Sequence, residues 1–411
     1  MLDRNLKPIK DLMYRYRTSF YYYEENIIER QIEVLMESFP QFEFLYSIKT
    51  NPFSPIVKFV TSKGFGADAA SSQEVLISHN AGLPPKKILY STPGKTRKDL
   101  EETIDKAIII ADSYNELRLI NDIAKQLNKV VKIGIRLNPS FNMDGEGAVS
   151  SKFGVDQNSL LAHRDLFRNL SNIKISGIHV HLRSQVLDYK KLYNYYENIF
   201  QLAEYCKEGL GWDIDFINFG GGLGLVYSLK NDTPLDIESL SYGCNRLIER
   251  YKNKLNIRLI IETGRFVICD AGCYVTPIVD IKESVGKKYL IVEKGLNGFM
   301  RPSIAELLSM TESGSIAAKS LEPLFTAKDA FEFIIPGGDS NAMEEVGIVG
   351  SLCTATDIMV KDIILPKANI GDLVIVTKAG SYSYSLSPLL FASHQLPLQF
   401  YMKKDGEVLY Q

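Results

Sequence analysis

A single lysine, Lys49, stands near the end of the apolar run FLYSIKTNPF, residues 44–53, just before Asn51 and Pro52. The aromatic and β-branched residues of this run predict a short strand, and the Asn-Pro pair ends it. At the carboxyl end of a strand in a parallel barrel, a lysine amine faces the active site. On most other folds the same lysine would be a surface cation, so the rest of the chain must decide its role.

Further polar groups close other predicted strands. The segment HVHLRSQ supplies His181 and Ser184, and ETGR supplies Glu262 and Arg265. The run NFGGGLG contains three consecutive glycines, residues 220–222, whose backbone N–H groups at a strand-to-helix turn can bind a phosphate. The run departs from the dinucleotide-binding spacing G-x-G-x-x-G, because its last position is a leucine. Taken alone, the glycines fit a tight connection equally well.

A phosphate-binding turn, a reactive amine and a group that can stack on a ring together indicate one cofactor, pyridoxal 5′-phosphate (PLP). The Lys49 amine can form an imine with its aldehyde, and Ser184 and Arg265 can supplement the glycines at its phosphate. Glu262 can keep the pyridine nitrogen protonated, which makes the ring an electron sink. His181 can lie flat on the ring, although a histidine met by itself is more often a hydrogen-bonded core residue.

The elements that must position these residues alternate between short apolar strands and charged segments of helical period over residues 25–270. Runs such as VVKIGIRLN and IRLIIETG alternate with segments such as SYNELRLINDIAKQLNK. About seven or eight β-then-α units over this length predict an α/β domain of the (β/α)8 barrel type. An open, doubly wound sheet is the alternative.

Residues 271–411 have a different pattern. Strand-like runs such as CYVTPIVDIKES, DAFEFIIPG and DLVIVTKAGSYSYS follow one another with few helical segments between them. We expect an all-β, antiparallel C-terminal domain, which a strand-like segment within residues 1–24 could join. Residues 302–323 carry no clear strand and are expected to form a loop or a short helix.

Composition excludes several classes of protein. With 411 residues, 23% of them charged, and a net charge of −2, the chain is expected to be a soluble protein of two domains without a nucleic-acid footprint. No apolar run reaches the roughly 18 residues of a membrane span, and the N-terminus has no signal-peptide core. The five cysteines form no CxxC pair, so we expect a cytoplasmic location and no metal site.

The motifs, taken in order, resemble those of the fold-type III PLP-dependent decarboxylases, the family of diaminopimelate, ornithine and arginine decarboxylases. Each motif is weak alone, whereas the whole series in the family's order is specific. The resemblance implies an alanine racemase-like barrel followed by a β-domain, and a head-to-tail homodimer with shared active sites. The motifs are YSIKTNP, GFGADAASSQE, IRLNP, KFGV, HVHLRSQ, NFGGGLG, ETGRF, GSLCTATD and AGSYSYS, between residues 46 and 388.

By position, the resemblance assigns roles to individual residues. It implies an imine at Lys49, pairing with the ring nitrogen at Glu262 and ring stacking at His181. It also implies that Cys353 returns a proton to the substrate and that Cys353 and Asp357 reach the partner subunit's site. Without the resemblance, a cysteine there would be interpreted as buried packing. The other implied cofactor-binding residues are Asp68, Arg136, Ser184, Gly221, Gly222, Arg265 and Tyr382.

Departures from the family bear on the substrate. Arg183 stands where glycine is usual, and Ser381 where alanine is usual. Thr354 follows Cys353, where diaminopimelate decarboxylases carry a glutamate that binds the distal ammonium of the substrate; a neutral hydroxyl cannot replace that charge. Arg301 in NGFMRPS keeps the residue that would bind a distal carboxylate, against the alternative of a surface arginine.

These features predict an enzyme that removes the α-carboxylate of an amino acid, or of an amino-acid conjugate, that carries a distal acid group. The pattern LCTxxD resembles decarboxylases of siderophore and aminoglycoside pathways, which indicates a specialised biosynthesis. A diaminopimelate decarboxylase of lysine biosynthesis is the alternative. A racemase is disfavoured, since racemases of this fold place an arginine at the ring nitrogen where this chain has Glu262. A protein that only binds partners would not need Lys49 and Cys353.

Overall fold

The computed structural model describes residues 6–228, 230, 232–309, 323–324 and 329–410. The chain divides into two compact units. The barrel unit comprises Ile32–Leu225 and Pro234–Gly264, and the sheet unit comprises Met1–Gln31, Val226–Thr233 and Arg265–Gln411. The sequence predicts one domain boundary, after residue 270, and that boundary remains a prediction. The two compact units also differ from it in one place, because the short segment Val226–Thr233 belongs to the sheet unit.

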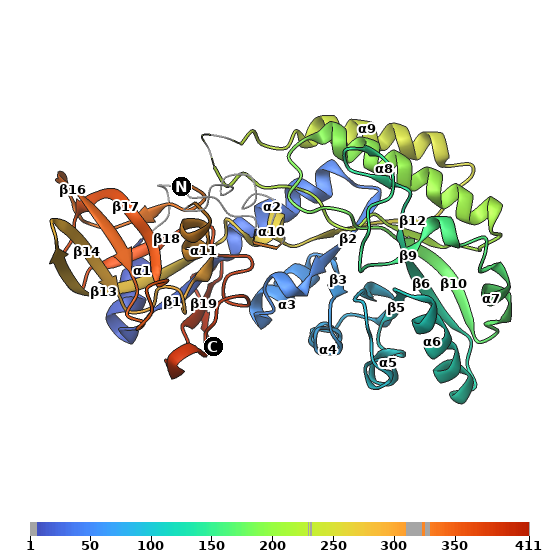
Figure 1. Ribbon diagram of the computed structural model, residues 1–411, viewed down its shortest axis with the longest axis horizontal. Coiled ribbons are helices and arrows are strands. Elements are labelled where there is room, and N and C mark those ends of the chain that lie inside the picture. The colour runs from blue at the N-terminus through green and yellow to red at the C-terminus, as the bar shows by residue number, and fades with distance from the viewer. Residues whose placement is uncertain (1–5, 229, 231, 310–322, 325–328, 411) are drawn as a thin grey trace. The chain divides into compact units, whose positions relative to one another are not determined.

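Eight parallel strands close the barrel unit (Figure 1), which confirms the expected (β/α)8 barrel. Each strand pairs with its neighbours in chain order, and the last strand pairs back to the first. Because all strands run the same way, their carboxyl ends meet at one end of the barrel. The strands are β2 (Phe42–Ser47), β3 (Gly66–Ala69), β4 (Ile88–Tyr90), β5 (Ile108–Ala111), β6 (Val131–Asn138), β10 (Ile173–His179), β11 (Phe216–Asn218) and β12 (Arg258–Thr263).

Helices alternate with these strands, and several begin where a side chain caps the first turn. Ser71, Thr96 and Ser113 each accept the backbone N–H of the third helical residue, which fixes where the strand-to-helix loop ends. The helices are α2 (Glu25–Ser38), whose first turns belong to the sheet unit, α3 (Ser54–Ser62), α4 (Ser72–Asn80), α5 (Arg97–Thr103), α6 (Tyr114–Gln126), α7 (Arg164–Asn169), α8 (Tyr189–Glu204) and α9 (Ile237–Tyr251).

The interior of the barrel is filled, so its chemistry must lie at the strand ends. The Phe216 ring occupies space left by two glycines: a Cβ added at Gly177 would lie 2.3 Å from it, and one added at Gly134 would lie 3.0 Å away. Leu45 and Ile260, from β2 and β12, belong to the same buried cluster. Large side chains opposite glycines fill the lumen to ordinary packing density.

Within the described residues, the sheet unit is built on one sheet of nine strands, together with three short α-helices and the first turns of α2. Two pairings, β1 with β19 and β14 with β16, are parallel, so the expectation of an antiparallel domain is too simple. The N-terminal strand β1 also pairs antiparallel with β13. The elements are α1 (Lys7–Tyr16), β1 (Phe20–Glu24), α10 (Arg265–Ile268), β13 (Gly272–Ser284), β14 (Lys287–Val292), α11 (Met300–Ser309), β15 (Phe333–Ile334), β16 (Asp339–Val349), β17 (Ile358–Lys367), β18 (Leu373–Val376), β19 (Leu398–Met402) and β20 (Val408–Tyr410).

The segment 302–323 is expected from the sequence to form a loop or a short helix. Residues 302–309 lie in α11, and residues 310–322 lie outside the described residues. Among the helices that the structure describes, we find none that is both long enough and apolar enough to span a bilayer.

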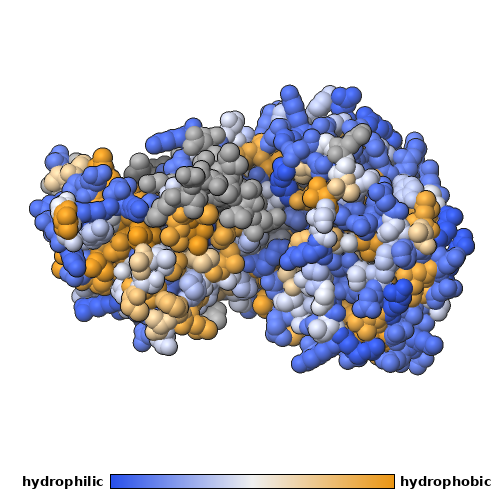
Figure 2. Space-filling view, in the orientation of Figure 1, coloured by the Kyte–Doolittle hydropathy of each residue, from blue (hydrophilic) through white to orange (hydrophobic). Residues whose placement is uncertain are grey.

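Figure 2 shows mainly hydrophilic residues on the drawn face of the barrel unit and more hydrophobic residues on the drawn face of the sheet unit. Leu390 and Ile364 of the sheet unit are 81% and 65% exposed.

Candidate functional site

Lys49 lies directly after β2, in a 3-10 turn formed by Ile48–Thr50, and its side chain is 47% exposed. Its Nζ is 3.6 Å from an Oδ2 of Asp68, which is fully buried at the end of β3. Two hydroxyls hold Asp68 in turn: Ser47 donates to Oδ2 at 2.9 Å, and Ser91 donates to Oδ1 at 2.7 Å. The amine is therefore paired with a rigid carboxylate and still accessible.

Glu74 lies beside this pair, in the first turn of α4. Its carboxylate accepts the backbone N–H of Ala70 at 2.7 Å, while its own N–H donates to Ser71. Burial, together with the nearby charge of Asp68, raises the pKa of Glu74 to about 7. The motif GFGADAASSQE thus supplies the carboxylate that pairs with Lys49 and a second carboxyl group that binds protons near neutral pH.

Glu262 closes β12 and is 5% exposed. Its Oε1 accepts a hydrogen bond from Asn218 Nδ2 at 2.7 Å and lies 3.3 Å from His179 Nε2. Burial, and secondarily the charge of Asp68, raises the pKa of this carboxyl to about 7, against the opposing charges of His181 and Lys49. A carboxylate so desolvated is poised to bind a cationic ring nitrogen.

His181 is oriented by the glycine run. The Gly221 N–H donates to its Nδ1 at 3.1 Å, and Nε2 lies 3.3 Å from Ser184 Oγ. Gly220 has φ of +68° and Gly222 of +148°, and a Cβ at Gly220 would lie 2.7 Å from the His181 Cβ. Glycine is needed at this turn for both conformation and space.

Arg136, near the end of β6, is 6% exposed, and its guanidinium carbon lies 4.3 Å from the centre of the Phe153 ring. Its Nη2 lies 3.4 Å from the carbonyl oxygen of His181 and donates to it. The arginine thus supports the backbone that carries His181. Of the residues that the sequence singles out, the barrel unit brings Lys49, Asp68, Arg136, His181, Ser184, Gly221, Gly222 and Glu262 to the carboxyl ends of its strands.

The sheet unit holds a second cluster, around Tyr227. Arg265 donates from Nη1 to the Tyr227 hydroxyl at 2.5 Å, and its guanidinium lies 4.6 Å from the centre of the Tyr382 ring. Arg301 lies over the Tyr227 and Phe331 rings, at 4.8 and 5.2 Å. The two arginines that the sequence assigns to anions therefore share one aromatic group within this unit.

Arg301 is fully buried in this unit. It donates from Nε to the Leu324 carbonyl at 2.9 Å and from Nη1 to the Ser381 carbonyl at 3.2 Å. The alternative of a surface arginine is therefore wrong. Binding of a distal carboxylate by Arg301 remains a prediction, and it requires the guanidinium to exchange some of these contacts for the substrate.

The loop between β16 and β17 carries the remaining expected residues. Cys353 is an exposed free thiol, so the interpretation as buried packing is wrong for this chain. Thr354 Oγ1 lies 3.0 Å from Thr356 Oγ1. Asp357 is 3% exposed and accepts the N–H groups of Leu296 and Leu352 at 2.6 and 2.9 Å; its reach into a partner subunit's site remains a prediction. Asp357 holds this loop within its own unit.

Sequence reasoning gave no role to the residues that support Asp68 and Glu262. Ser47 and Ser91 fix Asp68, and Asn218 and His179 contact Glu262. Each lies at or just beyond the end of a barrel strand, which is the only signal that could have found them. Among the described residues, we find no cluster of His, Cys, Asp or Glu that could hold a metal ion.

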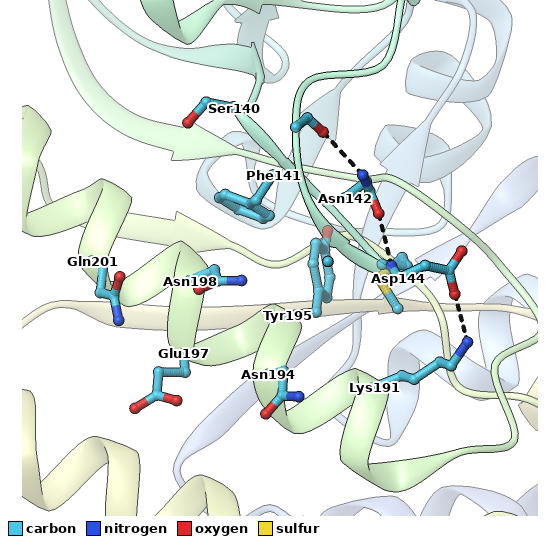
Figure 3. A pocket seen from close by; sticks show the side chains of 13 residues that line it. Ser140, Phe141, Asn142, Asp144, Lys191, Asn194, Tyr195, Glu197, Asn198 and Gln201 are labelled. Carbon is cyan, nitrogen blue, oxygen red and sulfur yellow. Dashed lines mark hydrogen bonds and ion pairs between the residues drawn. The ribbon is translucent and has the colours of Figure 1, made fainter.

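A separate cavity of about 660 Å³ lies along α8 under the hairpin of β7 (Phe141–Asn142) and β8 (Gly145–Glu146). Figure 3 shows Asp144, at the tip of this hairpin, paired with Lys191 of α8. Arg183 Nη2 donates to the same carboxylate at 2.7 Å. These two cations lower the pKa of Asp144 to about 2, and the departure from the family's glycine at Arg183 thus ties the hairpin to the loop after β10.

Comparisons with known proteins agree with this geometry. A family model described as "Pyridoxal-dependent decarboxylase, pyridoxal binding domain" matches residues 25–269. A diaminopimelate decarboxylase of Aquifex aeolicus is 31% identical over 388 residues, covering 92% of this chain and 85% of the relative. An L-glutamyl-[BtrI acyl-carrier protein] decarboxylase of Niallia circulans is 30% identical over 409 residues, covering 97% and 91%. The solved diaminopimelate decarboxylase from M. jannaschii, in complex with L-lysine, matches with a TM-score of 0.84 at 26% identity, covering 97% and 90%.

Proposed function

Because the chain belongs to the family of pyridoxal-dependent decarboxylases, we propose that it decarboxylates an amino acid or amino-acid conjugate bearing a distal acid group. We further propose a role in a specialised biosynthesis of the siderophore or antibiotic type. The observation that carries the substrate proposal is Thr354, a neutral hydroxyl beside the exposed Cys353 thiol. The Niallia circulans relative, an L-glutamyl-[BtrI acyl-carrier protein] decarboxylase, supports the proposal, since carrier-bound glutamate is an acid-bearing conjugate.

The donor set in the barrel unit fits PLP. The glycine turn has no room for a Cβ at Gly220, His181 is held by a backbone N–H, and Glu262 is desolvated. When bound, PLP supplies an electron sink for the electron pair left at the substrate Cα. Lys49 would hold the cofactor at its aldehyde end. Asp68, 3.6 Å from the Lys49 amine, would keep that amine at the strand end.

The remaining residues bind and orient. We assign the phosphate to the N–H groups of Gly221 and Gly222, with Ser184, Arg265 and Tyr382 as supplements, and the ring nitrogen to Glu262. His181 packs on the ring and keeps it flat. The Cys353 Sγ holds the proton that returns to Cα after carbon dioxide leaves.

We propose that the active unit is a head-to-tail homodimer with shared sites. The exposure of Cys353 supports this, because an acid that acts in a partner's site must project from its own subunit. Exposed apolar residues of the sheet unit, such as Leu390 and Ile364, offer surface that an interface could bury. All five cysteines are free, which agrees with a reducing, cytoplasmic location.

The alternative, a diaminopimelate decarboxylase of lysine biosynthesis, is favoured by the Aquifex aeolicus relative at 31% identity. The two functions separate in one experiment, a measurement of carbon dioxide release from a panel of substrates. The panel holds meso-diaminopimelate, lysine, ornithine, arginine, citryl-diaminopropionate and carrier-bound glutamate, with the Lys49→Ala protein as the blank. We expect the highest kcat/KM for an acid-bearing conjugate. Turnover of diaminopimelate at a rate normal for lysine biosynthesis would establish the alternative instead.

A further inference from the structure

A chain of neutral hydrogen-bonding groups connects the glycine turn to Glu262. The Gly220 N–H donates to Asn218 Oδ1 at 2.9 Å, and Asn218 Nδ2 donates to Glu262 Oε1 at 2.7 Å. Because Oδ1 is used as an acceptor, the amide can present only its NH₂ group to the carboxylate. Asn218 is fully buried, so neither of these contacts is shared with solvent.

His179 approaches the same carboxylate oxygen from β10. Its Nε2 lies 3.3 Å from Glu262 Oε1, and the side chain is 1% exposed. Burial, reinforced by the charges of Arg136, His181, Lys49 and Lys95, lowers the pKa of His179 well below its usual value. Within the described part of the chain, neither ring nitrogen makes a hydrogen bond of good geometry. A small rotation would direct an Nε2–H at the carboxylate.

We infer that Asn218 and His179 are positioning residues that hold Glu262 through Oε1 and leave Oε2 for the ring nitrogen of the cofactor. This inference rests on the cofactor part of the proposed function and not on its substrate. Both donors are uncharged, so they fix the carboxylate without cancelling the negative charge that the ring nitrogen requires. A lysine or arginine at either position would cancel that charge.

Asn218 has a second consequence, because it contacts both ends of the cofactor's binding site. Its Oδ1 fixes the first N–H of the glycine turn assigned to phosphate, and its Nδ2 fixes the carboxylate assigned to the ring nitrogen. Ordering of the turn by phosphate therefore also orders Glu262. His179 contacts only the carboxylate and lacks this link.

The experiment measures the affinity of the apoprotein for PLP and for pyridoxal, which lacks the phosphate, in a set of variants. His179→Leu and Asn218→Asp disturb the Glu262 contact and leave the turn intact, since an aspartate still accepts the Gly220 N–H; the aspartate also sets a second carboxyl group beside Glu262. We expect each to weaken both ligands by a similar factor, about tenfold when a charged group loses a polar partner. Asn218→Ala breaks the contacts with both Glu262 and the Gly220 N–H. It should therefore weaken PLP more than pyridoxal, which lowers the ratio of the two affinities.

A conservative variant, a matched control and a folding measurement separate a positioning role from a purely structural one. His179→Gln, which keeps a neutral donor, should recover affinity and the visible spectrum of the bound cofactor relative to His179→Leu. Asn138→Ala is the matched control, because Asn138 also ends a barrel strand and is buried but donates to Val149 and Asp156 instead. The Tm of each apoprotein reports folding. If Asn218→Ala does not fold, the PLP affinities of Asn218→Asp and His179→Leu test the inference, because both substitutions keep a side chain of similar volume.

The inference is overturned if the folded Asn218 and His179 variants bind PLP with the wild-type affinity and spectrum. It is also overturned if their losses only equal that of Asn138→Ala, because that result would show a purely structural role. Failure of the wild type to bind PLP would refute the cofactor assignment itself. A wild type that binds PLP but decarboxylates no acid-bearing substrate would refute the proposed function, while the affinities would still test this inference.

Discussion

In the barrel unit, the carboxylates of the site stand at or just after strand ends, where hydroxyl, amide and backbone groups hold them. Asp68 accepts from two serines, and Glu262 accepts from Asn218. In the sheet unit, two buried arginine side chains lie over aromatic rings. Arg265 and Arg301 both contact Tyr227, and they donate to a hydroxyl or to carbonyl oxygens.

The two units differ in the kind of backbone that carries their buried charged side chains. The ends of parallel strands bring several residues within a few ångströms, so short carboxylates and neutral donors suffice for a precise arrangement. Ring faces and carbonyl oxygens stabilise a guanidinium without cancelling its charge. The carboxylates Asp68 and Glu262 are therefore held by neutral donors, and the two arginines are held by rings and oxygens that leave them cationic.

The largest effect is expected from Lys49→Ala, which removes the amine on which the barrel site depends. Activity and the visible absorbance of the bound cofactor should both be abolished, while far-UV circular dichroism and Tm stay close to wild type. Lys58→Ala, an exposed lysine on α3, is the control and should change neither. A Lys49→Ala protein with measurable turnover would refute the cofactor assignment.

The next largest effect is expected from Glu262→Gln, which removes a buried carboxylate of the barrel unit. The variant should still bind PLP, yet its turnover should fall at least about a hundredfold, because a neutral amide cannot keep the ring nitrogen protonated. Burial raises the pKa of Glu262 to about 7 in the apoprotein, so ionised Glu262 destabilises it increasingly as pH rises from about 4.5 to about 7. Glu262→Gln should flatten this fall in Tm. Near-wild-type turnover would mean that another group supplies the proton.

Mixing two inactive proteins tests whether the two regions act across subunits. Lys49→Ala lacks the barrel amine, and Cys353→Ala lacks the acid of the sheet unit. Random reassortment should restore about a quarter of full activity, because half of the dimers are mixed and each carries one intact site. Activity is measured after the subunits have exchanged. Exchange without rescue would place Cys353 in its own chain's site or give it no role.

Thr354→Glu is expected to have an intermediate effect and tests the sheet unit's part in specificity. The new carboxylate should pair with a distal ammonium, and kcat/KM for meso-diaminopimelate should rise by about one to two orders of magnitude. The measured quantity is the ratio of kcat/KM for diaminopimelate to that for an acid-bearing conjugate. Thr356→Glu, on the same loop, is the control. An unchanged ratio would show that another residue binds the distal group.

The smallest effect is expected from Arg183→Gly, which restores the residue usual in the family. Asp144 and Arg183 are about half exposed, and Lys191 still holds Asp144, so kcat/KM should fall less than about threefold. Added salt should bring the wild type towards the variant, because salt screens exposed pairs. Arg168→Gly breaks another exposed pair, on α7, as the control. A loss of tenfold or more, estimated as about 1.4 kcal/mol, would show that the pair does more than hold the hairpin.

The sequence alone was sufficient for the barrel and for the residues that stand at its strand ends. Strand and helix periods are local, and a parallel barrel puts every strand's carboxyl end on one side whatever the lengths of its loops. Lys49, His181 and Glu262 could therefore be assigned to one site before any contact was known. The family's motif order strengthened this assignment, and the matched family model over residues 25–269 confirms the family.

Only the tertiary structure decided which residues support that site and how the rest of the chain is divided. Asn218 and His179 look like ordinary strand residues until closure of the barrel brings β10 and β11 beside Glu262. Asp357 could not be placed from its motif, because its backbone partners include Leu296, 61 positions away. The same holds for Val226–Thr233, which leaves the barrel unit after the glycine run. Such pairings depend on which distant segments meet on folding, and local sequence patterns do not encode that choice.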